Sequence, residues 1–171
     1  MKGFGLELKP LSLETLELVR NWRNDELVLQ FMQFKHYISQ EEQLNWFRTL
    51  NDAYYFVIYE HETPLGLINI KKIDYEEFSG EAGLFIGNKT FKGTGVALGA
   101  SVLLLDFAFD RLELRTVGAT MHKQNKDAIL YNKLLGFEYS KSVDDQFEFW
   151  SMSKEKYLQK RKQLVQLINT K

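Results

Sequence analysis

Two glycines and a lysine mark the segment of this sequence with the clearest chemical potential. The run Phe91-Lys-Gly-Thr-Gly-Val-Ala97 stands between a strand-like segment and a long apolar segment with the character of a helix. A helix N-terminus carries unsatisfied N–H groups and a partial positive charge, and glycines let the backbone approach an anion closely. Lys92 adds a full charge. Residues 92–97 therefore predict a site for a pyrophosphate or a similar anion.

The glycine spacing separates this loop from two common phosphate-binding motifs. The sequence lacks G-x-x-x-x-G-K-[ST], and it departs from G-x-G-x-x-G because Gly93 and Gly95 are followed by Leu98 and only then by Gly99. On spacing alone, an ordinary tight turn between a strand and a helix is the competing explanation.

The composition excludes several other kinds of site. The chain has 171 residues, 44% of them hydrophobic and 26% charged, which is typical of one globular domain. It has no cysteine, so disulfides, thiolate metal sites and cysteine nucleophiles are excluded. Its histidines, at positions 36, 61 and 122, lack the spacing of metal ligands, and we expect no metal site.

Charge and hydropathy point to a location and exclude two classes of partner. The net charge of −1 provides no general basic field for nucleic acid or an anionic membrane. No run of apolar residues approaches the roughly 20 of a membrane span, and the first residues lack an apolar signal core. We therefore expect a cytoplasmic protein.

The elements that must position the loop alternate between helix and strand patterns. We expect strands over 6–11, 54–60, 65–73, 81–86, 114–122, 137–142 and 147–152, and helices over 12–23, 26–32, 39–50, 95–111, 125–135 and 153–168. Ser39 and Glu42 form a capping box, and Gly136 stands where a helix ends. The order predicts an α+β fold with a mixed sheet, in which the crossover helix 95–111 joins one parallel pair of strands.

Three blocks of the sequence resemble the GNAT N-acetyltransferase superfamily. Residues 92–97 are similar to its pyrophosphate signature, [Gln/Arg]-x-x-Gly-x-[Gly/Ala], with Lys92 in place of Gln or Arg. Residues 81–86 resemble its E-x-G-[Tyr/Leu]-x-[Ile/Val] strand, and Asn125, Ala128 and Gly136-Phe137 match its N-x-x-A…G-F segment. The resemblance covers roughly residues 4–152.

The N-terminal half is similar to one branch of that superfamily. Trp22-Arg-Asn24, Met32, Ile38-Ser-Gln-Glu-Glu42 and Trp46-Phe47 resemble a W-R-N…M…I-S-x-E-E-H-x-x-W-F run of RimJ/RimL-type acetyltransferases. Among these, the sugar-nucleotide aminosugar acetyltransferases of the pseudaminic acid pathway are the most similar. Gln43 stands where that run commonly has histidine.

The resemblance implies a fold and a donor. The GNAT fold is a mixed, mostly antiparallel sheet with splayed central strands, flanked by helices, and the cosubstrate is acetyl-CoA. The pantetheine arm would lie along the backbone of Leu84, Phe85 and Ile86, as an added strand does. Its pyrophosphate would lie on the loop formed by Lys92, Gly93, Thr94, Gly95, Val96 and Ala97. Asn125 would contact the arm, cap the helix that follows, or do both.

The resemblance also implies direct attack of an amine on the thioester. An amine with a pKa of about 10 needs a proton acceptor at neutral pH, and Glu81 is the candidate, through a water; the alternative is a salt-bridged strand glutamate. A tyrosine would protonate the leaving thiolate. Tyr131 fits this role by the local Y-x-K pattern, whereas counting from Asn125 and Ala128 places Asn132 in that position. One residue turns a helix by about 100°, so the two alternatives differ.

The acceptor side would be built by the first helices and the hairpin. Arg23 would bind a phosphate or carboxylate, and an apolar floor would come from Trp22, Met32, His36, Trp46 and Tyr75. The aromatic character favours an aminosugar nucleotide as acceptor. The alternatives are a protein N-terminus, as in ribosomal-protein acetyltransferases, and an acyl-CoA-binding module without catalysis.

Residues 1–152 are interpreted as the acetyltransferase domain and residues 153–171 as a helical extension. The extension carries an apolar stripe formed by Tyr157, Leu164, Leu167 and Ile168. Such a stripe suits docking on the domain or on the partner in a homodimer. Its narrowness disfavours a membrane surface.

Overall fold

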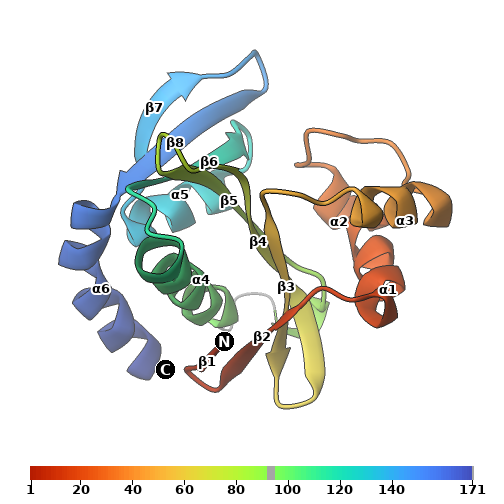
Figure 1. Ribbon diagram of the computed structural model, residues 1–171, viewed down its shortest axis with the longest axis horizontal. Helices are drawn as coiled ribbons and strands as arrows, with labels where there is room; N and C mark the ends of the chain where they lie inside the picture. Colours follow the sequence, from red (N-terminus) through yellow and green to blue (C-terminus); the bar gives the residue numbers. More distant parts are fainter. Residues whose placement is uncertain (92–94, 171) are drawn as a thin grey trace.

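The computed structural model describes residues 1–91 and 95–170, which form one mixed sheet with helices on both of its faces (Figure 1). The strand order across the sheet is β1-β2-β3-β4-β5-β6-β8-β7. The strands are β1 (Lys2–Gly3), β2 (Leu6–Pro10), β3 (Tyr54–Glu60), β4 (Thr63–Asp74), β5 (Ser79–Ile86), β6 (Thr116–His122), β7 (Glu138–Ser142) and β8 (Phe147–Ser153). The helices are α1 (Leu13–Asn24), α2 (Glu26–Leu29), α3 (Gln40–Arg48), the 3₁₀ turn η1 (Lys89–Phe91), α4 (Val96–Asp106), the π-helical turn η2 (Phe107–Arg111), α5 (Lys126–Leu135) and α6 (Lys154–Asn169).

Local chemistry at the helix ends accounts for several of these boundaries. The hydroxyl of Ser39 accepts from the Glu42 N–H while the Glu42 carboxylate accepts from the Ser39 N–H, so the capping box is confirmed. Asn125 caps α5 by accepting from the Ala128 N–H at 3.1 Å. Gly136 ends α5 in the left-handed region, at φ 111°, where a side chain would be strained.

The central strands separate, as the resemblance implies. β5 and β6 form the parallel pair, whose register runs from Ser79↔Thr116 to Glu81↔Gly118. Beyond that point β5 continues to pair with β4 and β6 continues to pair with β8. Between residues 82–86 and 119–122, each strand therefore has one edge without a strand partner in the described part of the chain. The expected α+β fold with a mixed, mostly antiparallel sheet is confirmed.

Two layers of helices cover the sheet, and each has its own apolar cluster (Figure 1). The larger cluster joins α4, α5 and α6 to the strands and includes Ile68, Ile70, Ala119 and Met121. The smaller one joins α1 and α3 to the opposite face and includes Val57 and Leu67. Because neighbouring side chains along a strand point to opposite faces, residues 67, 69 and 71 of β4 lie on the α1–α3 face.

One predicted helix is divided in the structure. The pattern predicted a single helix over 95–111, but α4 ends at Asp106 and gives way to the π-helical turn η2. There the Leu112 N–H bonds to the Phe107 carbonyl at 3.1 Å, one residue wider than in an α-helix. The apolar periodicity of the sequence does not distinguish the two hydrogen-bond patterns.

The C-terminal helix α6 packs along α4 (Figure 1). Tyr157 and Leu164 are buried in the larger cluster, Ile168 is partly buried against it, and Leu167 stays exposed. Asp106 at the end of α4 accepts from the Tyr157 hydroxyl at 2.6 Å and from the Arg161 guanidinium through both of its oxygens at 2.7 Å. Of the two expected roles for the stripe, docking on the domain is the one seen in this chain.

Candidate functional site

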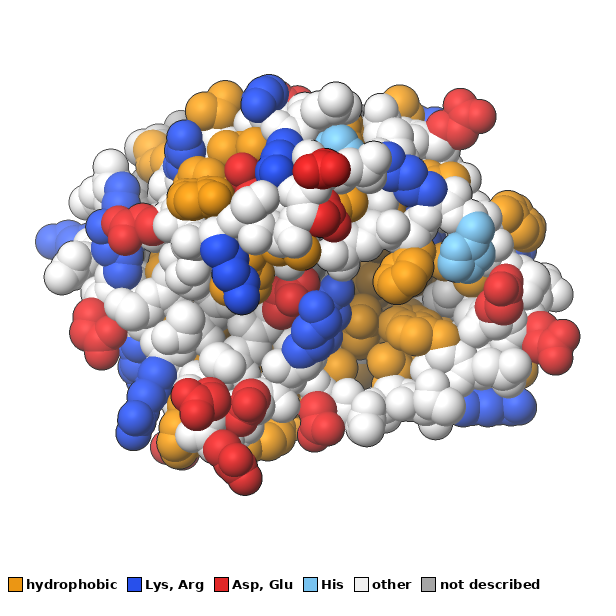
Figure 2. Space-filling view, turned by 90° about the horizontal axis from the view of Figure 1, so that it is seen from above, with side chains coloured by type: hydrophobic (Ala, Val, Ile, Leu, Met, Phe, Trp, Pro, Cys, Tyr) orange, Lys and Arg blue, Asp and Glu red, His pale blue; other side chains and the backbone are white. Residues whose placement is uncertain are grey.

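A pocket of about 550 Å³ passes through the gap between β5 and β6. Its lining includes α1 and α3 on one face of the sheet and Ser101, Tyr131 and Asn132 from α4 and α5 on the other. Figure 2 shows a hollow lined by apolar side chains, with basic and acidic side chains on its rim. The pocket therefore connects the two faces of the molecule at the point where the strands separate.

Glu81 lies on the α1–α3 face of the pocket between two lysines. Its side chain is 10% exposed, and its carboxylate lies 2.8 Å from Lys72 Nζ and 3.8 Å from Lys71 Nζ. Consecutive strand residues normally point to opposite faces, but a bulge between Lys71 and Asp74, with Lys72 at φ 51°, lets both lysines reach one carboxylate. Burial lowers the pKa of the Lys71 ammonium, and Glu81 opposes that shift. Glu81 is thus a pocket residue and also a salt-bridged one.

In the Trp22-Arg-Asn24 segment, only Arg23 lines the pocket, and each of the three residues makes different contacts. The Trp22 ring lies against Gly87, where a Cβ atom would come within 2.2 Å of the indole. Arg23 lines the pocket, donates from Nη2 to the Phe34 carbonyl at 2.8 Å, and leaves Nη1 buried without a partner. Burial also lowers the pKa of Arg23. Asn24 bonds to both the N–H and the carbonyl of Ile38 at 2.9 Å, which fixes the segment 31–38 over the pocket.

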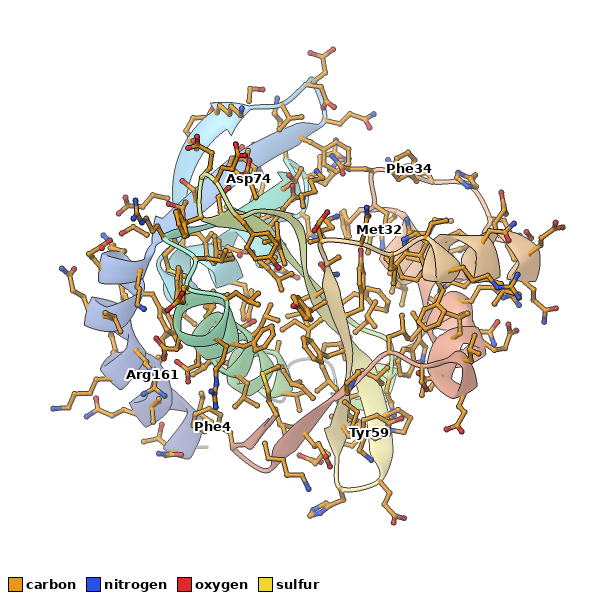
Figure 3. The ribbon with its side chains drawn as sticks, viewed as in Figure 1. Phe4, Met32, Phe34, Tyr59, Asp74 and Arg161 are labelled. Atoms are coloured by element: carbon orange, nitrogen blue, oxygen red, sulfur yellow. The ribbon has the colours of Figure 1, made fainter. Side chains whose placement is uncertain are left out.

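Four of the six expected acceptor-side residues meet in this pocket. Arg23, Met32, His36 and Trp46 line it, and Figure 3 shows Met32 and Phe34 on the segment that leads from α2 to α3. His36 Nε2 lies 4.0 Å from a Glu42 oxygen at the mouth. The other two lie elsewhere. Trp22 packs in the smaller apolar cluster, and Tyr75 lines a separate surface depression beyond Lys72.

The expected donor-side residues lie along the gap and at the start of α4. Leu84 and Phe85 line the pocket, and Ile86 continues the same unpaired strand edge. Gly95 caps α4 at φ 90°, a left-handed conformation that favours glycine, and Val96 and Ala97 form the first turn. Lys92, Gly93 and Thr94 lie outside the described residues. The described part of the anion loop thus forms the N-terminus of α4.

Tyr131 and Asn132 both reach the pocket, from different sides of α5. The Tyr131 hydroxyl lies 2.8 Å from the Ala97 carbonyl and 2.7 Å from Ser101 Oγ, and burial raises the pKa of Tyr131 well above its ordinary value. The Asn132 amide donates to the Ala128 carbonyl at 2.9 Å and to the Met121 sulfur at 3.0 Å. Of Tyr131 and Asn132, only Tyr131 therefore carries a hydroxyl proton, and the partners of that hydroxyl are the Ala97 carbonyl and Ser101 Oγ.

Several pocket residues were not predicted from the sequence. Asn69 on β4 and Ser101 on α4 line the pocket. Each is a polar residue that interrupts an apolar stretch of the sequence, and this interruption could have been used to predict them. His122 lies buried between the rings of Phe31 and Phe147, with centroid distances of 5.9 and 5.0 Å. Its Nδ1 accepts a hydrogen bond from the Gln124 N–H. The spacing of residues in the sequence does not predict these contacts of His122.

Within residues 1–91 and 95–170, no group of three or more acidic or histidine side chains is arranged to bind a metal ion. None of the helices described there is both long enough and apolar enough to cross a membrane.

Comparison with known proteins gives a consistent set of relatives. Residues 5–138 match the family model described as an acetyltransferase (GNAT) domain. The chain is 31% identical over 122 residues to acetyltransferase PseH of Campylobacter jejuni, a match that covers 70% of this chain and 74% of that protein. The spermidine N-acetyltransferase of Vibrio cholerae, solved with CoA and spermine, has a similar fold, with a TM-score of 0.80 at 20% identity over 91% of this chain and 99% of that one. A dodecameric structure of the same Vibrio enzyme gives a TM-score of 0.75 at 20% identity, over 91% of this chain and 98% of that one.

Proposed function

The chain belongs to the GNAT acetyltransferase family and is an N-acetyltransferase that uses acetyl-CoA, and from that premise we propose that its acceptor is the amine of a nucleotide-linked 4-amino-deoxysugar. The observation that carries the proposal is the unpaired, buried Nη1 of Arg23 beside an apolar wall containing Met32 and Trp46. A guanidinium suits a phosphate, and an apolar wall suits a deoxysugar. The resemblance of the N-terminal half to the aminosugar acetyltransferases of the pseudaminic acid pathway supports the same class of acceptor.

On the donor side, the residues fit acetyl-CoA as the family requires. The unpaired edge of β5 at Leu84, Phe85 and Ile86 offers backbone N–H and carbonyl groups to an extended, amide-containing chain. The α4 N-terminus at Gly95 offers free N–H groups to an anion. We propose that these two features bind the pantetheine arm and the pyrophosphate, that Lys92, Gly93 and Thr94 complete the loop, and that Asn125 and Asn132 contact the arm.

The chemistry that we propose is direct transfer. A new C–N bond forms as the thioester C–S bond breaks, the amine loses a proton, and the CoA sulfur gains one. Glu81 is the proposed proton acceptor, through a water, since it lines the pocket on the acceptor face. Tyr131 is the proposed proton donor, because its hydroxyl lines the pocket on the donor face, beside Ser101 Oγ. A backbone N–H near Leu84 or Phe85 would stabilise the developing oxyanion.

A protein N-terminus is the alternative acceptor. A peptide with a charged terminus would favour an open, acidic groove, whereas the pocket wall combines Arg23 with apolar side chains. An acyl-CoA-binding module without catalysis was the third possibility. We do not propose it, because the chain is a member of an acetyltransferase family. Assembly into a homodimer stays a prediction, to be measured by light scattering.

The test is a thiol-release assay with acetyl-CoA and a panel of amines. The panel contains UDP- and dTDP-linked 4-amino-4,6-dideoxy sugars, a ribosomal-protein N-terminal peptide and spermidine. We expect release with an aminosugar nucleotide and background rates with the others. Release with the peptide or spermidine alone would overturn the acceptor assignment. Arg23→Ala is expected to raise KM for the sugar nucleotide more than it lowers kcat. A contact to the phosphate would stabilise the bound substrate and the transition state equally, so its loss weakens binding without slowing the chemical step.

A further inference from the structure

Two buried polar side-chain atoms in the described part of the chain have no hydrogen-bond partner, and both residues line the same pocket. They are Arg23 Nη1 and Asn69 Oδ1. Native proteins rarely leave such atoms unpaired, because the group loses its bonds to water and gains none in return. Arg23 already has a place in the proposed acceptor site. Asn69 has none.

The position of Asn69 is set by the strand register. It lies on β4 directly opposite Gly83 of β5, between Ile68 and Ile70, which point into the core on the other face. A Cβ atom on Gly83 would come within 3.1 Å of both the oxygen and the nitrogen of the Asn69 amide. The glycine therefore leaves the space beside the amide free. Gly83 also stands two residues after Glu81, on the part of β5 that has separated from β6.

The geometry points to a role for Asn69 in the reaction. Resting on the proposed transfer to an amine, we propose that Asn69 Oδ1 accepts a hydrogen bond from an N–H of the acceptor amine and so directs its lone pair toward the thioester carbon. The Glu81 and Leu84 positions flank Gly83 along β5, so an acceptor amine at Asn69 would lie between the proposed proton acceptor and the proposed oxyanion donor.

An amide oxygen suits this task because it accepts a hydrogen bond without taking the proton. A neutral primary amine has two hydrogens and one lone pair. One N–H bonds to Asn69, the lone pair forms the C–N bond, and the proton that must leave goes to Glu81 through water. Asn69 therefore orients the nucleophile and leaves the proton balance of the reaction unchanged.

The test compares Asn69→Leu with the wild-type protein. Leucine has the same branched shape and the same number of side-chain heavy atoms, and its larger methyl groups have room in the pocket that Asn69 lines. Because it removes a buried oxygen that has no partner, we expect a melting temperature equal to or above that of the wild type. Turnover moves in the opposite direction, with kcat/KM for the acceptor falling about tenfold to a hundredfold. The dissociation constant for CoA, measured by calorimetry, stays the same. Asn45→Leu, an exposed position on α3 outside the pocket, is the matched control and changes none of these.

The outcomes separate this inference from the proposed function. The assay of Asn69→Leu uses whichever amine of the panel the wild-type protein acetylates. If the sugar nucleotides are not acetylated but another amine is, the proposed acceptor class is wrong and the role of Asn69 can still be tested. A kcat/KM of Asn69→Leu within twofold of wild type would overturn the inference. So would a lower melting temperature, because it would show that Asn69 has a structural hydrogen bond to lose, and this measurement needs no acceptor at all.

Discussion

The hydroxyl of Tyr131 on α5 lies 2.7 Å from Ser101 Oγ on α4, and the same hydroxyl lies 2.8 Å from the Ala97 carbonyl in the first turn of α4. Ser101 is the buried polar residue of a helix whose other buried residues are apolar or glycine. The pair thus links the proposed proton donor to the helix that begins at the proposed pyrophosphate site. When Tyr131 gives up its proton, the Ser101 hydroxyl can donate to the phenolate that remains.

Replacing Tyr131 by phenylalanine is expected to lower kcat about a hundredfold or more, the usual contribution of a positioned acid, with little change in CoA affinity. Ser101→Ala is expected to lower kcat less, because it removes a partner and not the donor. Steady-state kinetics with calorimetry for CoA checks both. Near-normal turnover in Tyr131→Phe combined with a large loss in Asn132→Ala would assign the donor position to Asn132.

The buried tyrosines predict how stability depends on pH. Burial raises the pKa of Tyr131, and burial together with Asp106 raises the pKa of Tyr157. In the unfolded chain both ionise near their ordinary value of about 10, whereas in the folded protein they resist ionisation. Their contribution to stability is therefore complete below about pH 10 and is lost as the pH rises through the folded-state pKa values. Chemical denaturation between neutral pH and pH 11 measures this loss, and Tyr131→Phe should make it smaller; an unchanged slope would contradict the burial argument.

Much of the fold was predictable because it depends on local chemistry. The capping box at Ser39 and Glu42, the cap at Asn125 and the end of α5 at Gly136 were all predicted from residue type and spacing. Tyr54–Glu60 was predicted to the residue, since its aromatic and β-branched residues favour a strand. The two-residue strand β1 was missed, since it exists only by pairing with β2.

The site was predictable only in part, because it depends on register and on turns that bring distant residues together. The bulge that brings both Lys71 and Lys72 to Glu81 has no signature in the run Lys71-Lys-Ile-Asp74. Asn69 could not be predicted as a site residue, because its candidacy depends on its position opposite Gly83 in the sheet. Trp22 and Tyr75 were expected in the acceptor site because they are aromatic. In the structure Trp22 packs against Gly87, and Tyr75 lines a separate depression. The sequence does not show which aromatic side chains line a cavity and which pack against a neighbouring residue.

The bulge at Lys72 predicts a nearly neutral substitution. A non-glycine residue at φ 51° is strained by about 1 kcal/mol, and an ion pair formed by a side chain that is 65% exposed contributes between about 0 and 1 kcal/mol. In Lys72→Gly the relief of strain and the loss of the pair nearly cancel, so the free energy of unfolding should change by less than about 1 kcal/mol. Lys72→Ala keeps the strain and loses the pair, so it should be the less stable of the two; urea denaturation of both variants decides this.

Glu81→Gln separates the two roles of this residue. If Glu81 accepts the proton, kcat/KM falls about a hundredfold at neutral pH and recovers partly at high pH, where more of the amine is already neutral. If Glu81 only pairs with the lysines, activity falls little and the pH profile keeps its shape. The measurement is the pH dependence of kcat/KM from pH 6 to 10, with Lys72→Ala as the control that disturbs the ion pair and retains the carboxylate.

Gly95 at the start of α4 predicts a combined effect on folding and on the donor. Its φ of 90° disfavours any side chain, so Gly95→Ala should lower the free energy of unfolding by about 1 kcal/mol. It should also weaken CoA binding, because the first N–H groups of α4 are displaced from the anion. Calorimetry with CoA and with pantetheine, which lacks the phosphates, checks this. An equal loss of affinity for both ligands would contradict the assignment of the pyrophosphate to this helix end.

A pocket that opens on both faces of the sheet has a kinetic consequence. The donor and the acceptor of the acetyl group would enter by separate routes, one from the α4–α5 side and one from the α1–α3 side, and meet only in the gap between β5 and β6. Neither molecule then has to leave before the other arrives. Initial-rate plots at several fixed concentrations of each substrate should give intersecting lines, the pattern of a ternary complex, and parallel lines would instead require an acetylated enzyme. The same separation would let the acceptor face change its specificity over evolution while the donor face stays as it is.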